Sequence, residues 1–213
     1  MRTVCVASIN SKNMGSPNSA LFTNLLPYDG VADYYAGVFS RPKANEYFTQ
    51  LMRTTAWQHD EAVMFGKRII TKRKVAWYGD EDYTYTYSKI ARRALPWTDT
   101  LQQIKAEIEA VSGHTFNSCL LNLYHNGEEG MGWHSDDERT LGDDIVIASL
   151  SLGAERKFSF KHKRNQQTVS VALEHGSLLV MKGATQTHWL HMLPKTKKVH
   201  QPRISLTFRT IVS

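Results

Sequence analysis

After Gly113 the chain consists of short β-rich segments, a pattern that few fold classes accommodate. Six of them, each four to eight residues long, are rich in β-branched and aromatic residues and often alternate apolar with polar side chains: 118–124, 145–152, 157–160, 168–173, 177–181 and 204–211. Turn residues separate the segments: Asn126-Gly127, Gly153, Asn165, Gly176, Gly183 and Pro202. Strands of this length and spacing predict an antiparallel sandwich or jelly roll.

Two helices are predicted ahead of these strands. The first covers residues 42–57, with Ser40 as its N-cap and an apolar face formed by Tyr47, Phe48, Leu51 and Met52. The second covers residues 98–112, where Leu101, Ile104, Ile108 and Val111 recur at helical spacing before Gly113. The predicted fold class is therefore α+β, mainly β with flanking helices.

The length of 213 residues and the apolar content of 41% suit a single domain with its own core. Residues 1–20 are rich in Ser and Asn and predict a flexible arm, so the domain is expected to span residues 21–213. No apolar run approaches the roughly 18 residues that a spanning helix needs, so no membrane association is expected.

The segment at the start of the sequence and the two cysteines bear on the compartment. The apolar stretch at residues 3–9 is too short for a secretory signal, which predicts a cytoplasmic protein, or a nuclear one in a eukaryote. Cys5 and Cys119 are expected to be free thiols in a reducing compartment.

The charges are unevenly placed, with a formal net charge of +6. Half of the 26 basic residues form four clusters: Lys67, Arg68, Lys72, Arg73 and Lys74; Arg92 and Arg93; Lys161, Lys163 and Arg164; Lys195, Lys197 and Lys198. Seven of the 20 acidic residues lie between positions 128 and 144. A basic rim around an acidic centre is typical of a metal-dependent enzyme on nucleic acid, although each cluster alone is also compatible with a solvated loop face.

His134-Ser135-Asp136 is the first candidate site. In an extended segment residues two apart point the same way, so the imidazole and the carboxylate can bind one metal ion. Four histidines downstream offer a third ligand: His175, His188, His191 and His200. Two histidines and one carboxylate on one face are the ligand set of non-haem Fe(II) oxygenases. A surface histidine beside a turn carboxylate is the alternative for this motif alone.

The last predicted strand is the second candidate site. Alternation places one set of side chains on a polar face: Arg203, Ser205, Thr207 and Arg209. Asn122 and Tyr124 likewise share one face of the strand before the His-x-Asp motif. Two inward guanidinium groups suit a dicarboxylate ligand, and structural ion pairs are the alternative.

Taken together, five ordered motifs closely resemble the AlkB family of Fe(II)- and 2-oxoglutarate-dependent dioxygenases, which remove alkyl groups from nucleobases. They are Asn122-Leu-Tyr124, Trp133 to Glu138, Ile147 to Gly153, Trp189-Leu-His191, and Arg203 to Arg209. The resemblance covers about residues 60 to 211, and the runs 65–67, 77–80 and 85–88 point to the DNA-repair branch. It implies a double-stranded β-helix core at about residues 115–213 and a nucleotide-recognition hairpin region at about residues 60–95.

The resemblance also implies the ligand set. His134, Asp136 and His191 match the iron ligands, with His188 as the rival third ligand. Six residues match the 2-oxoglutarate site: Asn122, Tyr124, Arg203, Ser205, Thr207 and Arg209. Arg203 and Tyr124 are expected at the distal carboxylate, and Arg209 and Asn122 nearer the iron. Ser205 stands where the family usually has Asn, so a shorter side chain faces the cosubstrate there.

The substrate contacts implied by the resemblance fall into two groups. The expected base pocket comprises Tyr85, Tyr87, Trp77, Tyr78, Asp137 and Glu138. The expected nucleic-acid contacts comprise Phe65, Lys67, Lys72, Arg73, Lys74, Lys161, Lys163 and Arg164. Phe65 is a candidate wedge into the base stack, with burial in the core as the alternative.

The function implied is oxidative demethylation of bases such as 1-methyladenine and 3-methylcytosine. It uses Fe(II), 2-oxoglutarate and dioxygen (O2) and releases succinate, carbon dioxide and formaldehyde. The expected partner is single- or double-stranded DNA, with RNA left open, and the expected state is a monomer. The alternative is a 2-oxoglutarate oxygenase that hydroxylates a protein or a small molecule.

Overall fold

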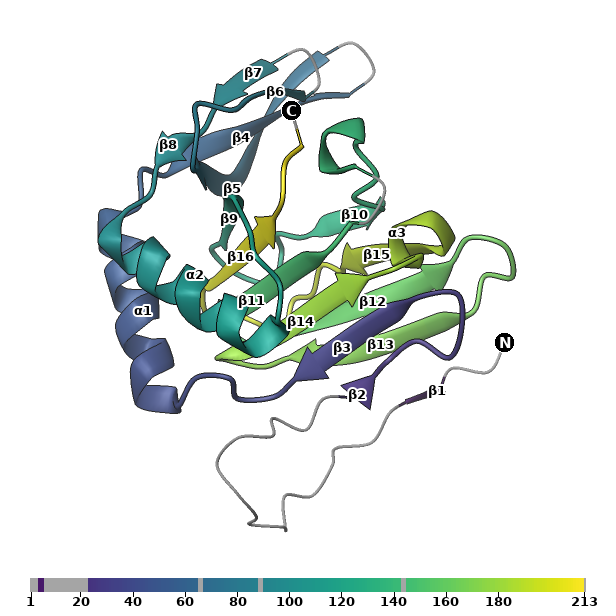
Figure 1. Ribbon diagram of the computed structural model, residues 1–213. Coiled ribbons are helices and arrows are strands. Elements are labelled where there is room, and N and C mark those ends of the chain that lie inside the picture. Colours follow the sequence, from purple (N-terminus) through teal and green to yellow (C-terminus); the bar gives the residue numbers. More distant parts are fainter. Residues whose placement is uncertain (1–3, 6–22, 65–66, 88–89, 143–144, 213) are drawn as a thin grey trace.

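Two mainly antiparallel β-sheets lie face to face, and two helices cover the outer side of the larger sheet (Figure 1). This computed structural model describes residues 4–5, 23–64, 67–87, 90–142 and 145–212. The arrangement confirms the predicted α+β class with a jelly-roll core.

The larger sheet has the order β2-β3-β14-β11-β16-β9-β5-β4, and β8 pairs with β5. Its strands are β2 (Thr23–Asn24), β3 (Val31–Tyr35), β4 (Gln58–Met64), β5 (Lys67–Gly79), β8 (Leu95–Pro96), β9 (Ser118–Tyr124), β11 (Ile147–Gly153), β14 (Ser177–Lys182) and β16 (Arg203–Arg209). Along β16, alternation buries Ile204, Leu206 and Phe208 toward the helices and turns the polar set toward the smaller sheet. The face assignment predicted for this strand is therefore confirmed.

The smaller sheet has the order β1-β13-β12-β15-β10. Its strands are β1 (Val4–Cys5), β10 (Met131–His134), β12 (Arg156–His162), β13 (Thr168–Leu173) and β15 (Trp189–Leu193). A separate ribbon pairs β6 (Thr84–Tyr87) with β7 (Ile90–Arg93). Between the two large sheets lies an apolar core that includes Phe160, Leu179 and Trp189.

The helices α1 (Arg41–Thr54) and α2 (Asp99–Ser112) form the second core against the larger sheet. Thr98 caps α2 by accepting the Leu101 N–H at 3.3 Å, and Gly113 ends it in the left-handed conformation, φ +72°. The prediction for α2 is confirmed. Helix α1 ends three residues earlier than predicted, because Thr55 adopts an extended backbone.

The six predicted strands all form, but other elements were missed. The strands not predicted individually are β1 to β8, β10 and β15, of which β4 to β7 fall mainly in the hairpin region expected at about residues 60–95. The short helix α3 (Thr185–His188) and the 3-10 turn η1 (Arg139–Leu141) were also missed. Strand β5 was missed because its first half is strongly basic, yet it pairs with β4 and β9.

The chain ends and the thiols add three observations. The predicted arm at residues 1–20 lies outside the described residues except for Val4–Cys5, which pair with β13. Cys119 is a free, fully buried thiol as predicted, and burial raises its pKa. In the described part of the chain, no helix combines the length and apolarity needed to cross a bilayer.

Candidate active site

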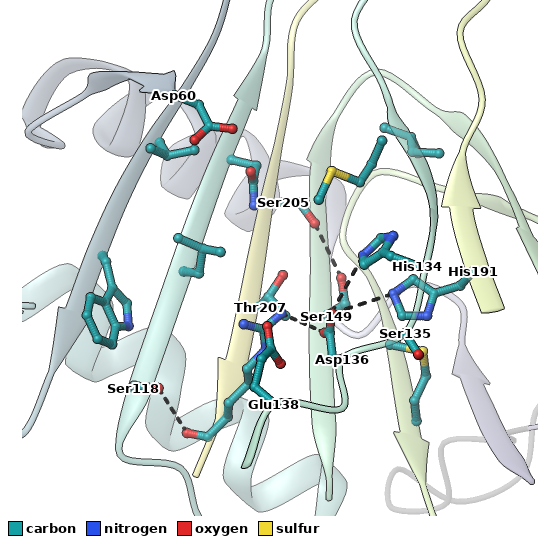
Figure 2. A pocket seen from close by; sticks show the side chains of 18 of the residues that line it. Asp60, Ser118, His134, Ser135, Asp136, Glu138, Ser149, His191, Ser205 and Thr207 are labelled. Carbon is teal, nitrogen blue, oxygen red and sulfur yellow. Dashed lines mark hydrogen bonds and ion pairs between the residues drawn. The ribbon is translucent and has the colours of Figure 1, made fainter. Parts of the chain in front are cut away.

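A cavity of about 250 Å³ opens between the two sheets. Its walls come from β4, β5, β9, β11, β14 and β16 of the larger sheet and from β10, β12 and β15 of the smaller sheet. The segments that follow β10 and β16 complete them. Every residue assigned to iron or 2-oxoglutarate in the sequence lines this cavity. Figure 2 shows several of these side chains pointing into the same space.

His134, Asp136 and His191 meet at one side of the cavity (Figure 2). His134 on β10 pairs directly with His191 on β15, so both rings point inward. Asp136 Oδ1 lies 3.6 Å from His134 Nε2 and 3.9 Å from His191 Nε2. The three ligand atoms lie within 4.8 Å of one another, and this set of two imidazoles and one carboxylate fits Fe(II) with open coordination positions.

The electrostatics of His191 and Asp136 and the hydrogen bonding of His134 suit metal binding. Burial lowers the pKa of His191 to about 3, so its imidazole is neutral at physiological pH. Burial raises the pKa of Asp136, but the electrostatic effects of Arg209 and the two imidazoles, with the Arg209 hydrogen bond, together outweigh it, and the net shift is downward. His134 Nδ1 lies 2.9 Å from the Gly132 carbonyl and donates to it, which leaves Nε2 free to bind a metal.

A second group of two histidines and one carboxylate, Asp29, His162 and His188, differs from this triad. His162 Nε2 lies 3.2 Å from Asp29 Oδ2, and His162 Nδ1 accepts the Asn165 N–H at 3.3 Å. Both nitrogens of this buried ring are therefore engaged already. His188 stacks on His162 at 6.2 Å, so the structure places the rival third ligand in this group and His191 in the triad.

Arg203 forms the buried end of the cavity wall on β16. Its side chain is 2% exposed and donates to Ser151 Oγ at 2.8 Å and Ser205 Oγ at 3.4 Å. Among the described residues no carboxylate lies within ion-pair distance of it, and burial lowers its pKa to about 10. A buried cation without a counterion is costly, so this position fits the carboxylate of a bound anion such as 2-oxoglutarate.

The neighbouring strands complete the anion site. The β9–β16 register sets Tyr124 opposite Arg203 and Asn122 opposite Ser205. Ser205 Oγ lies 3.3 Å from Ser149 Oγ, so the short side chain at position 205 bonds within the wall (Figure 2). Arg209, at the other end of β16, donates to Asp136 Oδ2 at 2.6 Å. The wall thus carries one guanidinium beside the triad and another remote from it.

Arg156 is a buried residue that sequence reasoning missed. It donates to four backbone carbonyls, those of Asn126, Gly127, Glu129 and Pro194, at 2.8–3.3 Å. These bonds join the loop after β9 to the segment after β15, next to Tyr124. A single arginine at a strand end gave no signal for this role.

The residues expected at the base divide between the cavity and other places. Trp77 and Glu138 line the cavity. The expectation for Tyr78 is wrong: it is 3% exposed, lies in the helix-side core and accepts the Ala56 N–H at 3.1 Å. Asp137 is exposed and bonds to Ser135 rather than lining the cavity. The side chains of Tyr85 and Tyr87 lie outside the described residues.

The residues expected to contact nucleic acid also differ in where they lie. Lys72 and Arg164 are exposed, and Lys74 is half-buried. Arg73 lines the cavity and pairs with buried Asp60, so it does not lie with the exposed basic residues, and its contact with nucleic acid stays a prediction. The side chain of Lys67 and the whole of Phe65 lie outside the described residues.

Two lysines of the smaller sheet have defined partners. The Lys161 ammonium lies 4.7 Å from the centre of the exposed Trp133 ring. The Lys163 ammonium donates to the Gln186 carbonyl at 2.8 Å and to Ser135 Oγ at 3.2 Å. Lys163 therefore contacts the segment between two triad residues.

Comparison with known proteins places the chain in a family. The model of the 2OG-Fe(II) oxygenase superfamily matches residues 32–209. DNA oxidative demethylase ALKBH2 of Homo sapiens is 40% identical over 195 residues, which cover 86% of this chain and 75% of that protein. Alpha-ketoglutarate-dependent dioxygenase alkB homolog 3 of Bos taurus is 40% identical over 185 residues, 82% of this chain and 64% of that protein.

A solved structure shares the fold. The structure of OsALKBH1 superimposes with a TM-score of 0.61 at 14% identity, covering 89% of this chain and 100% of that one. This likeness supports the fold alone, and the family assignment rests on the family match and the sequence relatives. The chain therefore belongs to the 2OG-Fe(II) oxygenase superfamily and to its AlkB family, as an Fe(II)- and 2-oxoglutarate-dependent dioxygenase.

Proposed function

We propose that this protein is a DNA oxidative demethylase that repairs N-alkylated bases of the 1-methyladenine and 3-methylcytosine type. It consumes 2-oxoglutarate and O2 and releases succinate, carbon dioxide and formaldehyde. The observation that carries the proposal is a single cavity that joins a His–Asp–His triad to an anion-binding wall and a mixed polar and apolar pocket. Relatives named DNA oxidative demethylase ALKBH2 support DNA as the substrate.

His134, Asp136 and His191 hold Fe(II) in this proposal, and the two arginines of β16 orient the cosubstrate. Arg203 and Tyr124 take the distal carboxylate, which neutralises a guanidinium that has no carboxylate partner among the described residues. Arg209 and Asn122 lie toward the iron-binding end. Bound iron supplies the activation of O2 that oxidises the methyl group, while the buried walls exclude water from the reacting atoms.

The methylated base must flip out of the DNA duplex to enter the same cavity, because a base that stays stacked cannot reach the triad. Val75, Trp77 and Leu120 supply an apolar wall for a flipped base. Glu138 lines the same cavity and is proposed to accept a hydrogen bond from an exocyclic amine. The pocket thereby selects a planar, partly polar group.

The charge distribution supports a polyanionic substrate. Exposed Lys72 and Arg164 add to a net charge of +6 and are proposed to contact phosphates. RNA is proposed as a second substrate. One chain supplies all three metal ligands, so we assign the activity to a monomer, acting where DNA is found: in the nucleus of a eukaryote or the cytoplasm of a bacterium.

Formaldehyde release from matched oligonucleotides tests the proposal. The panel contains 1-methyladenine, 3-methylcytosine or no methyl group in single-stranded DNA, duplex DNA and RNA of one sequence. Release is expected only from methylated strands and only with Fe(II) and 2-oxoglutarate. Succinate formation that no oligonucleotide stimulates, combined with oligonucleotide binding that does not respond to salt, would favour hydroxylation of a protein or a small molecule.

A further inference from the structure

The backbone of Asp136 lies outside the strand that carries the first metal ligand, His134. Strand β10 ends at His134, so Asp136 lies two residues beyond the last ladder pair with β15. Asp136 is nevertheless only 4% exposed. A buried N–H needs a hydrogen-bond partner, and the strand ladder does not provide one here.

Gln186 supplies that partner. Its side chain is 3% exposed, and Oε1 accepts the Asp136 N–H at 2.9 Å. The other end of the amide faces Met181 Sδ at 3.8 Å, which fixes the amide orientation because only the NH2 group can donate to sulfur. A buried glutamine side chain is therefore committed to a single backbone group of the triad segment.

Gln186 is itself held in place. Its carbonyl accepts from the Lys163 ammonium at 2.8 Å, and the same ammonium reaches Ser135 Oγ at 3.2 Å. Gln186 belongs to α3, which leads directly into β15 and His191. The amide thus joins the segment that carries Asp136 to the element that precedes His191.

We propose that Gln186 is a positioning residue for the metal site, and that Lys163 anchors it. The amide holds the Asp136 carboxylate at its distance from the two imidazoles before a metal ion binds. This inference rests on the assignment of His134, Asp136 and His191 as iron ligands. It gives Lys163 a role at the metal site in place of a phosphate contact.

Metal titration of matched variants tests this role. Gln186→Met keeps the length of the side chain but removes the acceptor, whereas Gln186→Glu keeps both. Purified metal-free proteins are titrated with Co²⁺, and binding is followed by calorimetry and by the visible absorption of the bound ion. Gln186→Met is expected to bind Co²⁺ about 10- to 100-fold more weakly, as for other residues that orient ligands. Gln186→Glu is expected to stay within about threefold of the wild type.

Leu51→Ala is the control for general destabilisation, because Leu51 is buried in the helix-side core away from the cavity. It should lower the melting temperature and leave Co²⁺ affinity unchanged. Wild-type affinity in Gln186→Met, equal losses in the Met and Glu variants, or an equal loss in Leu51→Ala would each overturn the proposal. If Gln186→Met does not fold, Lys163→Met is titrated instead. Lys163→Met is expected to bind Co²⁺ more weakly than the wild type, and an unchanged affinity would contradict the proposal.

Asp136→Ala separates this inference from the ligand assignment. Loss of Co²⁺ binding in Asp136→Ala with wild-type binding in Gln186→Met would contradict the positioning role and leave the ligand assignment intact. Wild-type Co²⁺ binding in Asp136→Ala would contradict both the ligand assignment and the positioning role.

Discussion

Arg203 and Tyr124 face each other across the paired strands β16 and β9, with the guanidinium carbon 5.7 Å from the centre of the phenol ring. Neither residue has a carboxylate partner among the described residues. The protein thus keeps a cation in its interior at an energetic cost that a bound anion would offset. We therefore propose that the remote end of the cavity binds an anion and that Arg203 is not part of a structural ion pair.

Arg203→Met is expected to impair cosubstrate binding without loss of stability. Removing one partner of a buried charge pair costs roughly 3–5 kcal/mol, so the KM for 2-oxoglutarate should rise about 100-fold or more. The free energy of unfolding without cosubstrate should be unchanged or higher, because an uncompensated buried charge is lost. Steady-state kinetics and denaturant unfolding measure the two effects.

Arg156→Met is the matched control for Arg203→Met, since both arginines are 2% exposed. Arg156 donates to four carbonyls, and each buried acceptor left unpaired costs about 1–3 kcal/mol. Its loss should lower stability by at least about 3 kcal/mol. If Arg203→Met destabilises the protein as much as Arg156→Met, Arg203 is structural.

Alanine at His134, Asp136 or His191 should abolish turnover and reduce bound iron, because each residue supplies one of three protein ligands. His188→Ala should retain most activity, since its ring stacks on His162 outside the triad. Elemental analysis of iron per chain and succinate formation give the two readouts. A His188→Ala loss as severe as that of His191→Ala would show that the third ligand is misassigned.

Trp77 and Tyr78 should respond oppositely to substitution because they point to opposite faces of β5. Trp77→Ala opens the cavity wall, so the KM for a methylated oligonucleotide should rise while the melting temperature changes little. Tyr78→Phe removes only the hydroxyl that accepts the Ala56 N–H, which costs about 1 kcal/mol and leaves kinetics unchanged. A higher KM for the methylated oligonucleotide in Tyr78→Phe would indicate that Tyr78 contacts the base after all.

Exposed and buried basic residues should differ in their salt dependence. Arg164→Ala and Lys72→Ala should weaken oligonucleotide binding and each reduce the slope of log affinity against log salt by about 1. Arg73→Ala should instead destabilise the fold by roughly 1.5–3 kcal/mol, because it removes a charged hydrogen-bond partner of buried Asp60. Unchanged salt slopes in both surface variants would show that nucleic acid binds to another part of the surface.

The alternating strands made much of the site predictable. On β9 and β16 the phase of alternation follows from Leu121, Leu123 and Ile204, which must be buried, so their polar neighbours face the cavity. The cavity position of Arg73 and the buried position of Tyr78 were not predicted for one reason, since β5 was not recognised as a strand and its phase was unknown. Adjacent residues on a strand cannot both line one cavity.

Other features had no signal in the sequence. The partnership of Gln186 with Asp136 joins residues 50 positions apart through one amide, and nothing in the composition around either residue indicates it. The separation of His188 from His191 depends on where α3 ends and β15 begins. A helix of four residues has too little periodicity to be predicted.

The ratio of repaired base to succinate tests whether the oxidation of 2-oxoglutarate is coupled to demethylation of DNA. The protein is incubated with Fe(II), 2-oxoglutarate and an oligonucleotide containing 1-methyladenine, and mass spectrometry measures both products in the same sample. One demethylated base is expected for each succinate above the background without oligonucleotide, and neither product is expected with Asp136→Ala. Succinate formed without loss of the methyl group, at a rate that the methylated oligonucleotide does not increase, would contradict this coupling.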